Sequence, residues 1–327
     1  MTLKRRLYLY ISHNNFLKVF LNIAIKINLL LFHWSERQQV LHRGILNPDK
    51  KFYIIRPRGM TEGLLSMYSW VTHFSKWCLL NGYEPYIDFE KNPCQYNVDR
   101  EINGTHNAWE YFFCQPSRYS RETVYKSKNV TVSGWTLFEK KNSFNKDIEL
   151  FSDAKEYKCY ITQYYNVQPY IYKLVDDKRK EIFGNDKILG VFLRGTDYVR
   201  LKPKGHHIQP SVEEIEFKIN EFLSKYKIDR IFVVTEDIDI FNTLKKDYGN
   251  MIFSSDDNFV ASKNIDYISE MFRDDAYERG LKYLIRLLLL TKCDYLITSL
   301  ASGSMFAMNI KEDSYIDSYI FDIGLYQ

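Results

Sequence analysis

The chain has 327 residues, 45% of them hydrophobic, which is enough for two domains with cores of ordinary size. Its 45 basic and 41 acidic residues leave a net charge of only +4, which argues against a dedicated nucleic-acid-binding protein. Five scattered cysteines without a Cys-x-x-Cys pair indicate reduced thiols in a cytoplasmic protein, and neither a disulfide framework nor a zinc site.

Residues 1–45 are predicted to form a basic, amphipathic helical segment. Three basic residues at 4–6 precede a mostly apolar stretch from 16 to 32, and polar side chains interrupt that stretch every four residues, at Lys18, Asn22 and Lys26. Such a stretch is a poor membrane span, and no secretory cleavage site follows it. Two interpretations stay open: peripheral contact of residues 1–35 with the cytoplasmic face of an inner membrane, or packing on the globular body.

Residues 46–183 are predicted to form a first Rossmann-like domain. A strand at 52–56, a helix with apolar residues at three- and four-residue spacing, and a strand at 83–89 make a β-α-β unit. Gly59 and Gly63 lie between strand and helix, where glycine lets a ligand approach the backbone, although a plain turn needs glycine too. The less regular region 91–151 is expected to supply loops around an acceptor site, and a charged helix at 168–183 to link the domains.

Residues 184–327 alternate strands with helices, which implies a second Rossmann-like domain with a parallel sheet and right-handed crossovers. The predicted strands are 188–194, 230–235, 251–254, 294–298 and 316–321. The predicted helices are 211–226, 238–247, 276–291 and 303–309. The domain boundary is therefore predicted at 183/184.

Arg194 follows an apolar run without alternation, which is typical of a central parallel strand. Ligands of open α/β sheets bind beyond the carboxyl ends of such strands, and a guanidinium matches the oxygens of a diphosphate. The sequence therefore predicts an anion site at Arg194, with Thr196 and Asp197 beside it. The alternative is an Arg-Asp pair that only closes a loop.

Two further strand ends carry candidate site residues. Asp237 and Asp239 could hold a divalent ion on a diphosphate, or Thr235 could cap the next helix with Glu236 and the aspartates in its first turn. Asp256 and Asp257 are equally ambiguous. The last strand leads into a turn of small residues and a helix amino terminus, which suit phosphate but also occur without ligands: Ser299, Ser302, Gly303 and Ser304.

The loop after Arg194 contains His206 and His207, and Ser211 with Glu214 is predicted to form a capping box at the next helix. His206 could accept a proton from an attacking hydroxyl, because the ordinary pKa of histidine is near neutrality. The alternative is a solvated loop histidine. Chelation of one metal by two adjacent histidines is improbable.

The order of these motifs resembles the donor-binding half of the fucosyltransferase superfamily. The resemblance rests on Arg-Gly-Thr-Asp at 194–197, Ile-Phe-Val-Val-Thr-Glu-Asp at 231–237 and Leu-Leu-Thr-Lys-Cys-Asp-Tyr-Leu-Ile-Thr-Ser-x-x-Ser at 289–302. It covers residues 186–310, and more loosely Arg56 to Trp70 and the Trp109 segment. It implies an α/β fold of the GT-B type, in which two Rossmann-like domains with parallel sheets face each other across a cleft.

By position, the resemblance implies that Arg194 contacts the donor β-phosphate and that Thr196, Asp197 and His206 match the residues downstream of it. Ser299 and Ser302 match a hydroxyl turn near the diphosphate. Glu236 and Asp237 match an acidic strand end that needs no metal in those enzymes.

Three departures bear on the donor. Phe192 and Gly195 replace a histidine and an arginine of the family's His-x-Arg-Arg motif, and Arg286 stands near the position of an aspartate that binds guanine. A guanidinium cannot accept the guanine protons. A GDP-sugar is therefore favoured as donor without being secured.

The resemblance implies a glycosyltransferase that moves fucose or a related sugar from a nucleoside diphosphate to a saccharide or lipid-linked saccharide acceptor. The transfer is expected to be inverting and metal-independent, without a cofactor, in bacterial capsule or lipopolysaccharide synthesis, with Asp197 or His206 as base. Two alternatives stay open: a metal-dependent glycosyltransferase that uses Asp237 and Asp239, and a non-catalytic sugar-binding subunit of a polysaccharide assembly.

Overall fold

A computed structural model describes residues 19, 23, 38–41, 44–57, 62–134, 151–255 and 275–327, without the side chains of Thr196 and Asp197. Most of the predicted N-terminal segment, together with Gly59, Asp256 and Asp257, lies outside these residues. The chain forms two compact units, named here unit 1 (Met1–Glu62 and Trp70–Ser152) and unit 2 (Gly63–Ser69 and Asp153–Gln327). Within the described ranges, no helix is long and apolar enough to cross a membrane.

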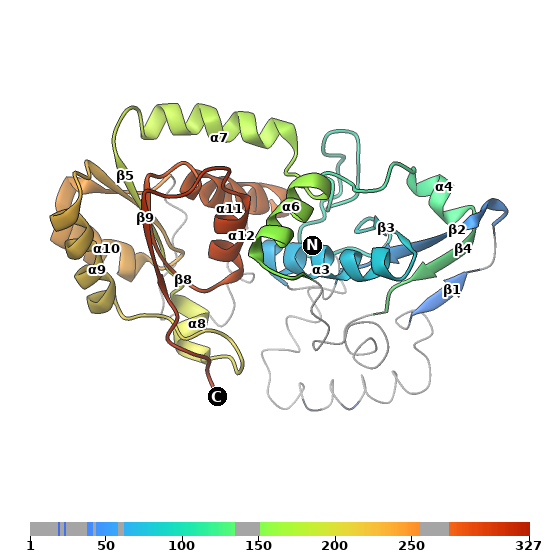
Figure 1. Cartoon of the computed structure of the whole chain (residues 1–327), viewed down its shortest axis with the longest axis horizontal. Coiled ribbons are helices and arrows are strands. Elements are labelled where there is room, and N and C mark those ends of the chain that lie inside the picture. Colours follow the sequence, from blue (N-terminus) through green and yellow to red (C-terminus); the bar gives the residue numbers. More distant parts are fainter. Residues whose placement is uncertain are drawn as a thin grey trace. The chain divides into compact units, whose positions relative to one another are not determined.

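Unit 1 contains a four-stranded sheet of order β1-β4-β2-β3 (Figure 1). β2 (Leu46–Ile55) pairs in parallel with β3 (Glu84–Ile87) and with β4 (Ser127–Val132), and β1 (Gln39–Leu41) lies antiparallel to β4. Helix α3 (Leu64–Leu80) connects β2 to β3, which confirms the predicted strand-helix-strand unit, and α4 (Arg121–Tyr125) precedes β4. The sequence did not predict β4, although Val130 and Val132 alternate with polar residues and are buried.

Unit 2 contains a five-stranded, fully parallel sheet of order β7-β6-β5-β8-β9. Its strands are β5 (Ile188–Phe192), β6 (Arg230–Val234), β7 (Ile252–Phe253), β8 (Tyr295–Ser299) and β9 (Asp317–Phe321). The predicted helices are α9 (Val212–Lys225), α10 (Ile238–Tyr248), α11 (Ala276–Leu290) and α12 (Ser302–Ile310), and a short 3₁₀ turn, η2 (Gly249–Met251), precedes β7. All nine predicted elements of this half are confirmed to within a few residues.

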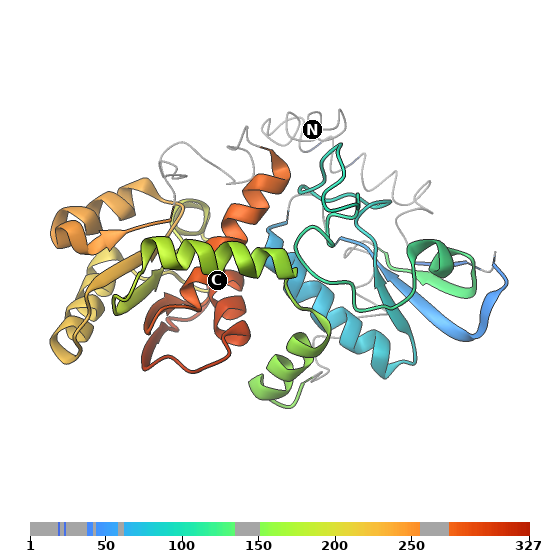
Figure 2. The same cartoon turned by 90° about the horizontal axis from the view of Figure 1, so that it is seen from above.

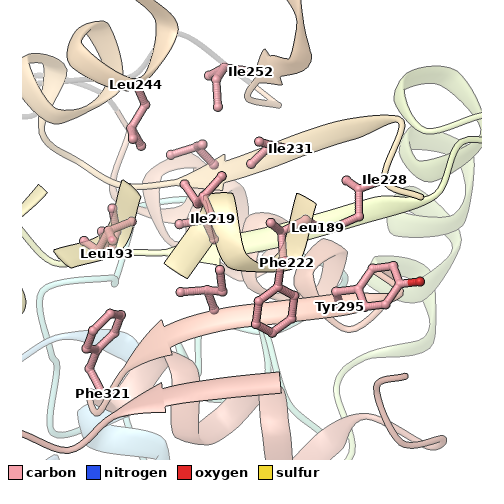
Figure 3. Packing of buried hydrophobic residues seen from close by; sticks show 14 residues of the cluster. Leu189, Leu193, Ile219, Phe222, Ile228, Ile231, Leu244, Ile252, Tyr295 and Phe321 are labelled. Carbon is pink, nitrogen blue, oxygen red and sulfur yellow. The ribbon is translucent and has the colours of Figure 1, made fainter. Parts of the chain in front are cut away.

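The core of unit 2 explains why the sequence of β5 does not alternate. One face packs Leu189 and Val191 against Ile219 and Phe222 of α9, as Figure 3 shows for Leu189, Ile219 and Phe222. On the other face, a Cβ added at Gly190 would lie 3.1 Å from the Cys293 sulfur, so the strand and the end of α11 approach closely there. All five residues of β5 are therefore buried, as expected for a central parallel strand.

Helices α6 (Ala154–Tyr164) and α7 (Pro169–Ile182) belong to unit 2, and Figure 2 shows α7 from above. α7 packs on α11, and α6 packs on α12. The long segment of unit 2 therefore begins at Asp153, whereas the sequence predicts the second domain to begin at residue 184. The hydroxyl of Tyr68 donates to the Tyr165 carbonyl at 3.1 Å, which ties the start of α3 to this unit. A further short helix, α8 (Thr196–Leu201), follows Arg194 in what was predicted to be loop.

Candidate functional site

The carboxyl ends of the unit 2 strands gather several of the predicted donor-binding residues along one sheet edge. Phe192, the last residue of β5, is in register with Val234 of β6 on one side and Thr298 of β8 on the other. The three segments that follow these strands therefore lie beside one another, with Arg194 in the middle one. These segments are 193–195, 235–237 and 300–304.

Arg194 contacts a carboxylate and an aromatic ring. Its side chain is 15% exposed, and its Nε is 3.7 Å from Oε1 of Glu236, whose side chain is 11% exposed. Its guanidinium carbon lies 4.7 Å from the centroid of the Tyr198 ring. The same Glu236 oxygen accepts a hydrogen bond from the Gly195 amide at 3.0 Å, so one carboxylate holds both the arginine and the turn after it.

Gly195 stands where the His-x-Arg-Arg motif has its last arginine, and it is tightly packed. A Cβ at this position would lie 2.6 Å from both Cβ and Oδ2 of Asp237. Any side chain here would therefore force Asp237 to move. The other departure, Phe192, is 1% exposed, and its ring lies where a Cβ on Gly303 would come within 3.0 Å of it. An apolar ring thus fills the position of the motif histidine.

Asp237 is the amino-terminal cap of α10, and the prediction that Thr235 caps this helix is wrong. Oδ1 of Asp237 accepts from the amides of Asp239 at 2.9 Å and Ile240 at 3.3 Å, whereas the Thr235 hydroxyl accepts from the Asp237 amide at 3.1 Å. Thr235 lies too far upstream, because α10 begins only at Ile238. In the part of the chain that is described, no three His, Cys, Asp or Glu side chains converge as metal ligands. These contacts favour the capping interpretation.

The turn from β8 into α12 uses two of its hydroxyls internally. Ser304 Oγ donates to the Ser299 carbonyl at 2.6 Å, and Ser299 Oγ donates to Oε1 of Gln209. Both serines are buried, with exposures of 1% and 0%. Ser302 is half-buried at the first position of α12, where backbone N–H groups have no intrahelical acceptor.

His206 is exposed and lies against Tyr198. Its Nδ1 is 3.1 Å from the Tyr198 hydroxyl, and the two rings meet edge to face at 5.3 Å. The C-terminal residues hold this loop, because the Gly205 amide donates to the Tyr326 carbonyl at 2.8 Å and the Tyr326 amide donates to the His206 carbonyl at 2.9 Å. The capping box predicted at the start of α9 is confirmed, with Ser211 Oγ accepting from the Glu214 amide at 3.2 Å.

The contacts described for the remaining predicted site residues do not point to a ligand. Arg286 is buried on α11, with 7% exposure. Gly63 precedes α3, and a Cβ there would meet nothing within 4 Å, so packing does not require glycine. Thr196 and Asp197 begin α8, and their side chains are not among those described. The binding and catalytic roles assigned to these residues stay predictions.

Sequence reasoning missed two residues of this edge, Tyr198 and Gln209. Gln209 is 8% exposed and links Ser299 to the His207 carbonyl, to which its Nε2 donates at 3.0 Å. Its place directly before the Pro-Ser cap of α9 is the signal that could have drawn attention to it. No signal pointed to Tyr198, because tyrosine is common throughout this chain.

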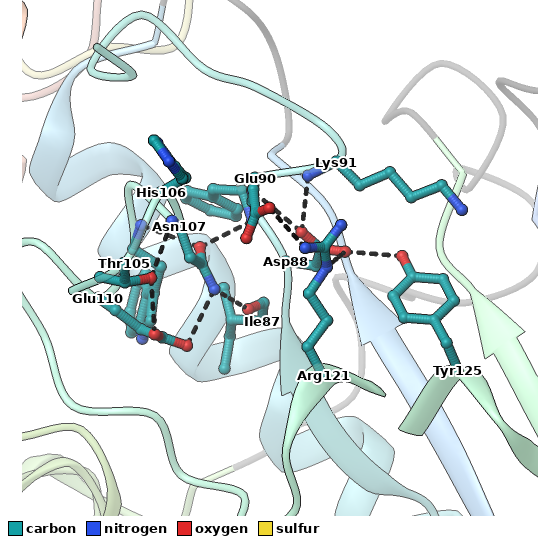
Figure 4. A network of polar contacts seen from close by, with 12 residues as sticks. Ile87, Asp88, Glu90, Lys91, Thr105, His106, Asn107, Glu110, Arg121 and Tyr125 are labelled. Atoms are coloured by element: carbon teal, nitrogen blue, oxygen red, sulfur yellow. Dashed lines mark hydrogen bonds and ion pairs between the residues drawn. The ribbon is translucent and has the colours of Figure 1, made fainter. Parts of the chain in front are cut away.

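A second polar network lies at the carboxyl end of β3 in unit 1 (Figure 4). Asp88 is 0% exposed, and its Oδ1 accepts from the amides of Glu90 at 3.0 Å and Lys91 at 2.9 Å. Its Oδ2 accepts from the Tyr125 hydroxyl at 2.7 Å and lies 3.6 Å from Nε of Arg121. Burial, followed by the charge of Asp88, raises the pKa of Tyr125 well above its ordinary value.

Asn107 extends this network towards Glu110. Its Nδ2 donates to the Ile87 carbonyl at 2.8 Å and to Glu110 Oε1 at 3.0 Å, and its Oδ1 accepts from the Phe89 amide at 2.9 Å (Figure 4). These are bonds to backbone and side chains of the same local segment. The network therefore fixes the chain after β3.

No protein-family model matches this sequence, and a search of curated proteins found no match. Solved structures with a similar fold include two of fucosyltransferases. A NodZ α-1,6-fucosyltransferase structure soaked with GDP-fucose is 13% identical, with a TM-score of 0.51 over 80% of this chain and 93% of that chain. A fucosyltransferase NodZ structure from Bradyrhizobium is 14% identical, with a TM-score of 0.50 over 79% and 91%. The shared fold, the fully parallel sheet of unit 2 and the sheet of unit 1, which is parallel except for its edge strand β1, confirm the predicted GT-B-like α/β class.

Proposed function

We propose that this protein is a glycosyltransferase that moves a sugar, fucose or a related one, from a nucleoside diphosphate to a hydroxyl of a saccharide acceptor. The observation that carries the proposal is Arg194, held at the carboxyl end of the central strand β5 on the edge where open α/β sheets bind ligands. The fold is that of a fucosyltransferase soaked with GDP-fucose, which supports a GDP-sugar as the first donor to test.

In this reaction the acceptor oxygen forms a bond to the anomeric carbon, and the bond from that carbon to the diphosphate oxygen breaks with inversion. The electron pair stays on the leaving diphosphate, and a base takes the acceptor proton. Arg194 would stabilise the charge that grows on the diphosphate, together with Ser302 and the first amides of α12. Asp197 and His206 remain the proposed bases.

We propose that the transfer needs no metal, because Asp237 is engaged as a helix cap. A role in bacterial capsule or lipopolysaccharide synthesis, with a lipid-linked saccharide as acceptor, extends the same proposal. The peripheral membrane contact of residues 1–35 would bring the enzyme to such an acceptor.

A second candidate function is a non-catalytic sugar-binding subunit, and two observations favour it. The motif histidine is replaced by the buried Phe192, and Gly195 has no room for a second arginine. A transferase would then have to work with a single guanidinium at this strand end.

A donor panel tests these functions. Calorimetry with GDP-fucose, GDP-mannose, UDP-glucose and dTDP-rhamnose requires no acceptor, and we expect the GDP-sugars to bind. Release of nucleoside diphosphate is then measured with and without EDTA, and equal rates are expected. Binding without release supports the non-catalytic subunit, loss of release in EDTA supports the metal-dependent alternative, and binding of no donor contradicts the proposal.

A further inference from the structure

Tyr198 contacts two of the predicted functional side chains that follow β5, Arg194 and His206. Its ring faces the Arg194 guanidinium at 4.7 Å, and its hydroxyl lies 3.1 Å from Nδ1 of His206. We propose that Tyr198 is a positioning residue, which holds Arg194 in the orientation that a donor diphosphate requires and is itself held by His206. The inference rests on the proposed function and assigns a further role within the same site.

The Tyr198 ring and the Glu236 carboxylate both restrict the Arg194 side chain. A cation over an aromatic face is attracted to it, and the attraction grows when both groups are removed from water. With 15% of its side chain exposed, Arg194 is largely desolvated here. The Glu236 carboxylate at 3.7 Å and the Tyr198 ring at 4.7 Å together limit the guanidinium to few rotamers. A preset orientation matters because arginine binds a diphosphate through a planar fork of donors.

The absence of a second arginine makes this orientation more important. Gly195 cannot carry a side chain without displacing Asp237, so a single guanidinium must match the diphosphate oxygens at this strand end. The backbone also holds Tyr198 in place, because its amide donates to the Gly195 carbonyl at 3.2 Å and thereby fixes the first turn of α8. The ring is thus positioned directly beside the strand end.

The hydroxyl of Tyr198 is braced from a separate part of the chain. His206 lies in a loop that pairs with the C-terminal residues through the reciprocal backbone bonds between 205–206 and Tyr326. The backbones of His207 and Leu325 also pair, as an isolated antiparallel β-bridge. Because Nδ1 of His206 lies 3.1 Å from the Tyr198 hydroxyl, this nitrogen braces the tyrosine.

Calorimetry with GDP and guanosine tests the inference, since guanosine lacks the phosphates that Arg194 would bind; UDP and uridine are used if UDP binds more tightly. We expect Tyr198→Leu to weaken GDP binding about tenfold and to leave guanosine binding unchanged. Tyr198→Phe, which keeps the ring, should stay within about threefold of the wild type. Val199→Ala, an exposed position on α8, is the matched control and should bind GDP like the wild type.

A double-mutant cycle with Arg194→Ala decides whether Tyr198 acts through the arginine. We expect Tyr198→Leu to have no further effect on GDP binding once Arg194 is alanine. The inference would be overturned if Tyr198→Leu weakened GDP binding equally with arginine and with alanine at position 194. It would also be overturned if the substitution weakened GDP and guanosine binding equally, or weakened neither. If the wild type binds none of the donors in the panel, the proposed function itself has failed; if it binds GDP or UDP and Tyr198→Leu binds equally well, only the role of Tyr198 has failed.

Discussion

The two sheets carry charged side chains at corresponding carboxyl edges, but they use these side chains differently. In unit 1, Asp88 is completely buried and is bonded to two amides and a tyrosine hydroxyl at 2.7 to 3.0 Å. In unit 2, Arg194 is partly exposed, and its contacts with Glu236 and Tyr198 are longer, at 3.7 and 4.7 Å. We infer that the edge of unit 1 is built for stability and the edge of unit 2 for a ligand.

Arg194→Ala should give the largest effect in unit 2. Removing a donor that stabilises charge in the transition state typically lowers kcat by about 10²- to 10³-fold, or about 3 to 4 kcal/mol. The melting temperature should change little, because Glu236 still accepts the hydrogen bond from the Gly195 amide after the arginine is removed. Nucleotide release measures kcat, and circular dichroism measures the melting temperature. Arg200→Ala, at an exposed arginine of α8, is the control. Activity equal to that of the wild type would remove Arg194 from the site.

Asp88→Ala should do the reverse and destabilise unit 1 by about 3 kcal/mol, because two amides, a hydroxyl and Arg121 lose their common acceptor. The described tryptophans, Trp70, Trp77 and Trp109, lie in unit 1, so tryptophan fluorescence during urea unfolding reports on this unit. Asp99→Ala, at an exposed aspartate of the same unit, should change the free energy of unfolding by less than about 0.5 kcal/mol. If Asp88→Ala and Asp99→Ala changed the free energy of unfolding equally, the proposed stabilising role of the unit 1 edge would be contradicted.

Gly195→Ala tests how tightly the unit 2 edge is packed. Because the added methyl would lie 2.6 Å from Asp237, we expect a loss of about 2 kcal/mol in circular dichroism unfolding and a matching loss of donor binding. Adding Asp237→Gly in the same chain removes the clashing atoms and should restore most of the loss. Gly63→Ala, where a Cβ meets nothing within 4 Å, is the control. Additive losses in the double variant would contradict the close approach.

Tyr125→Phe removes one bond from the unit 1 network and should cost about 1.5 kcal/mol at neutral pH, since the acceptor is a carboxylate. The pKa of Tyr125 is raised in the folded chain, first by burial and then by Asp88, so the neutral phenol favours folding. This contribution is complete below about pH 10, the ordinary pKa of tyrosine, and is lost as the pH rises above it. The variant should therefore lose less stability than the wild type as the pH is raised from about 9 to about 11. Parallel pH profiles would contradict this role.

The sequence predicted the elements whose burial leaves a regular pattern. The run at 188–192 is buried throughout, and α9 places Ile215, Ile219 and Phe222 on one face, so both could be found from spacing alone. Helix α8 escaped prediction because six residues after a glycine cap carry no periodicity. Helix α6 has only two buried side chains, and its best signal was Asp153 capping the amide of Glu156.

The site was predictable as far as strand order fixes it. Parallel strands bring their carboxyl ends to one edge, which is why Arg194, Glu236 and Ser302 could be grouped from the sequence. The contact of Tyr198 with Arg194 depends on the turn geometry of α8, and the bonds between Tyr326 and the His206 loop join segments that are far apart in the chain. Neither leaves a local pattern in the sequence.

Substitution of Asp237 has the smallest expected effect and separates the capping from the metal interpretation. Asp237→Ala should destabilise unit 2 by about 1 kcal/mol, because the amides of Asp239 and Ile240 lose their acceptor. Asparagine caps helices as well as aspartate but is a weaker ligand for divalent ions, so Asp237→Asn should keep both stability and nucleotide release. Asp239→Ala, at an exposed position, should also release nucleotide normally. If the asparagine variant is stable but inactive, and excess magnesium restores its activity, then the carboxylate binds a metal and the donor edge of unit 2 works by different chemistry from that proposed for Arg194.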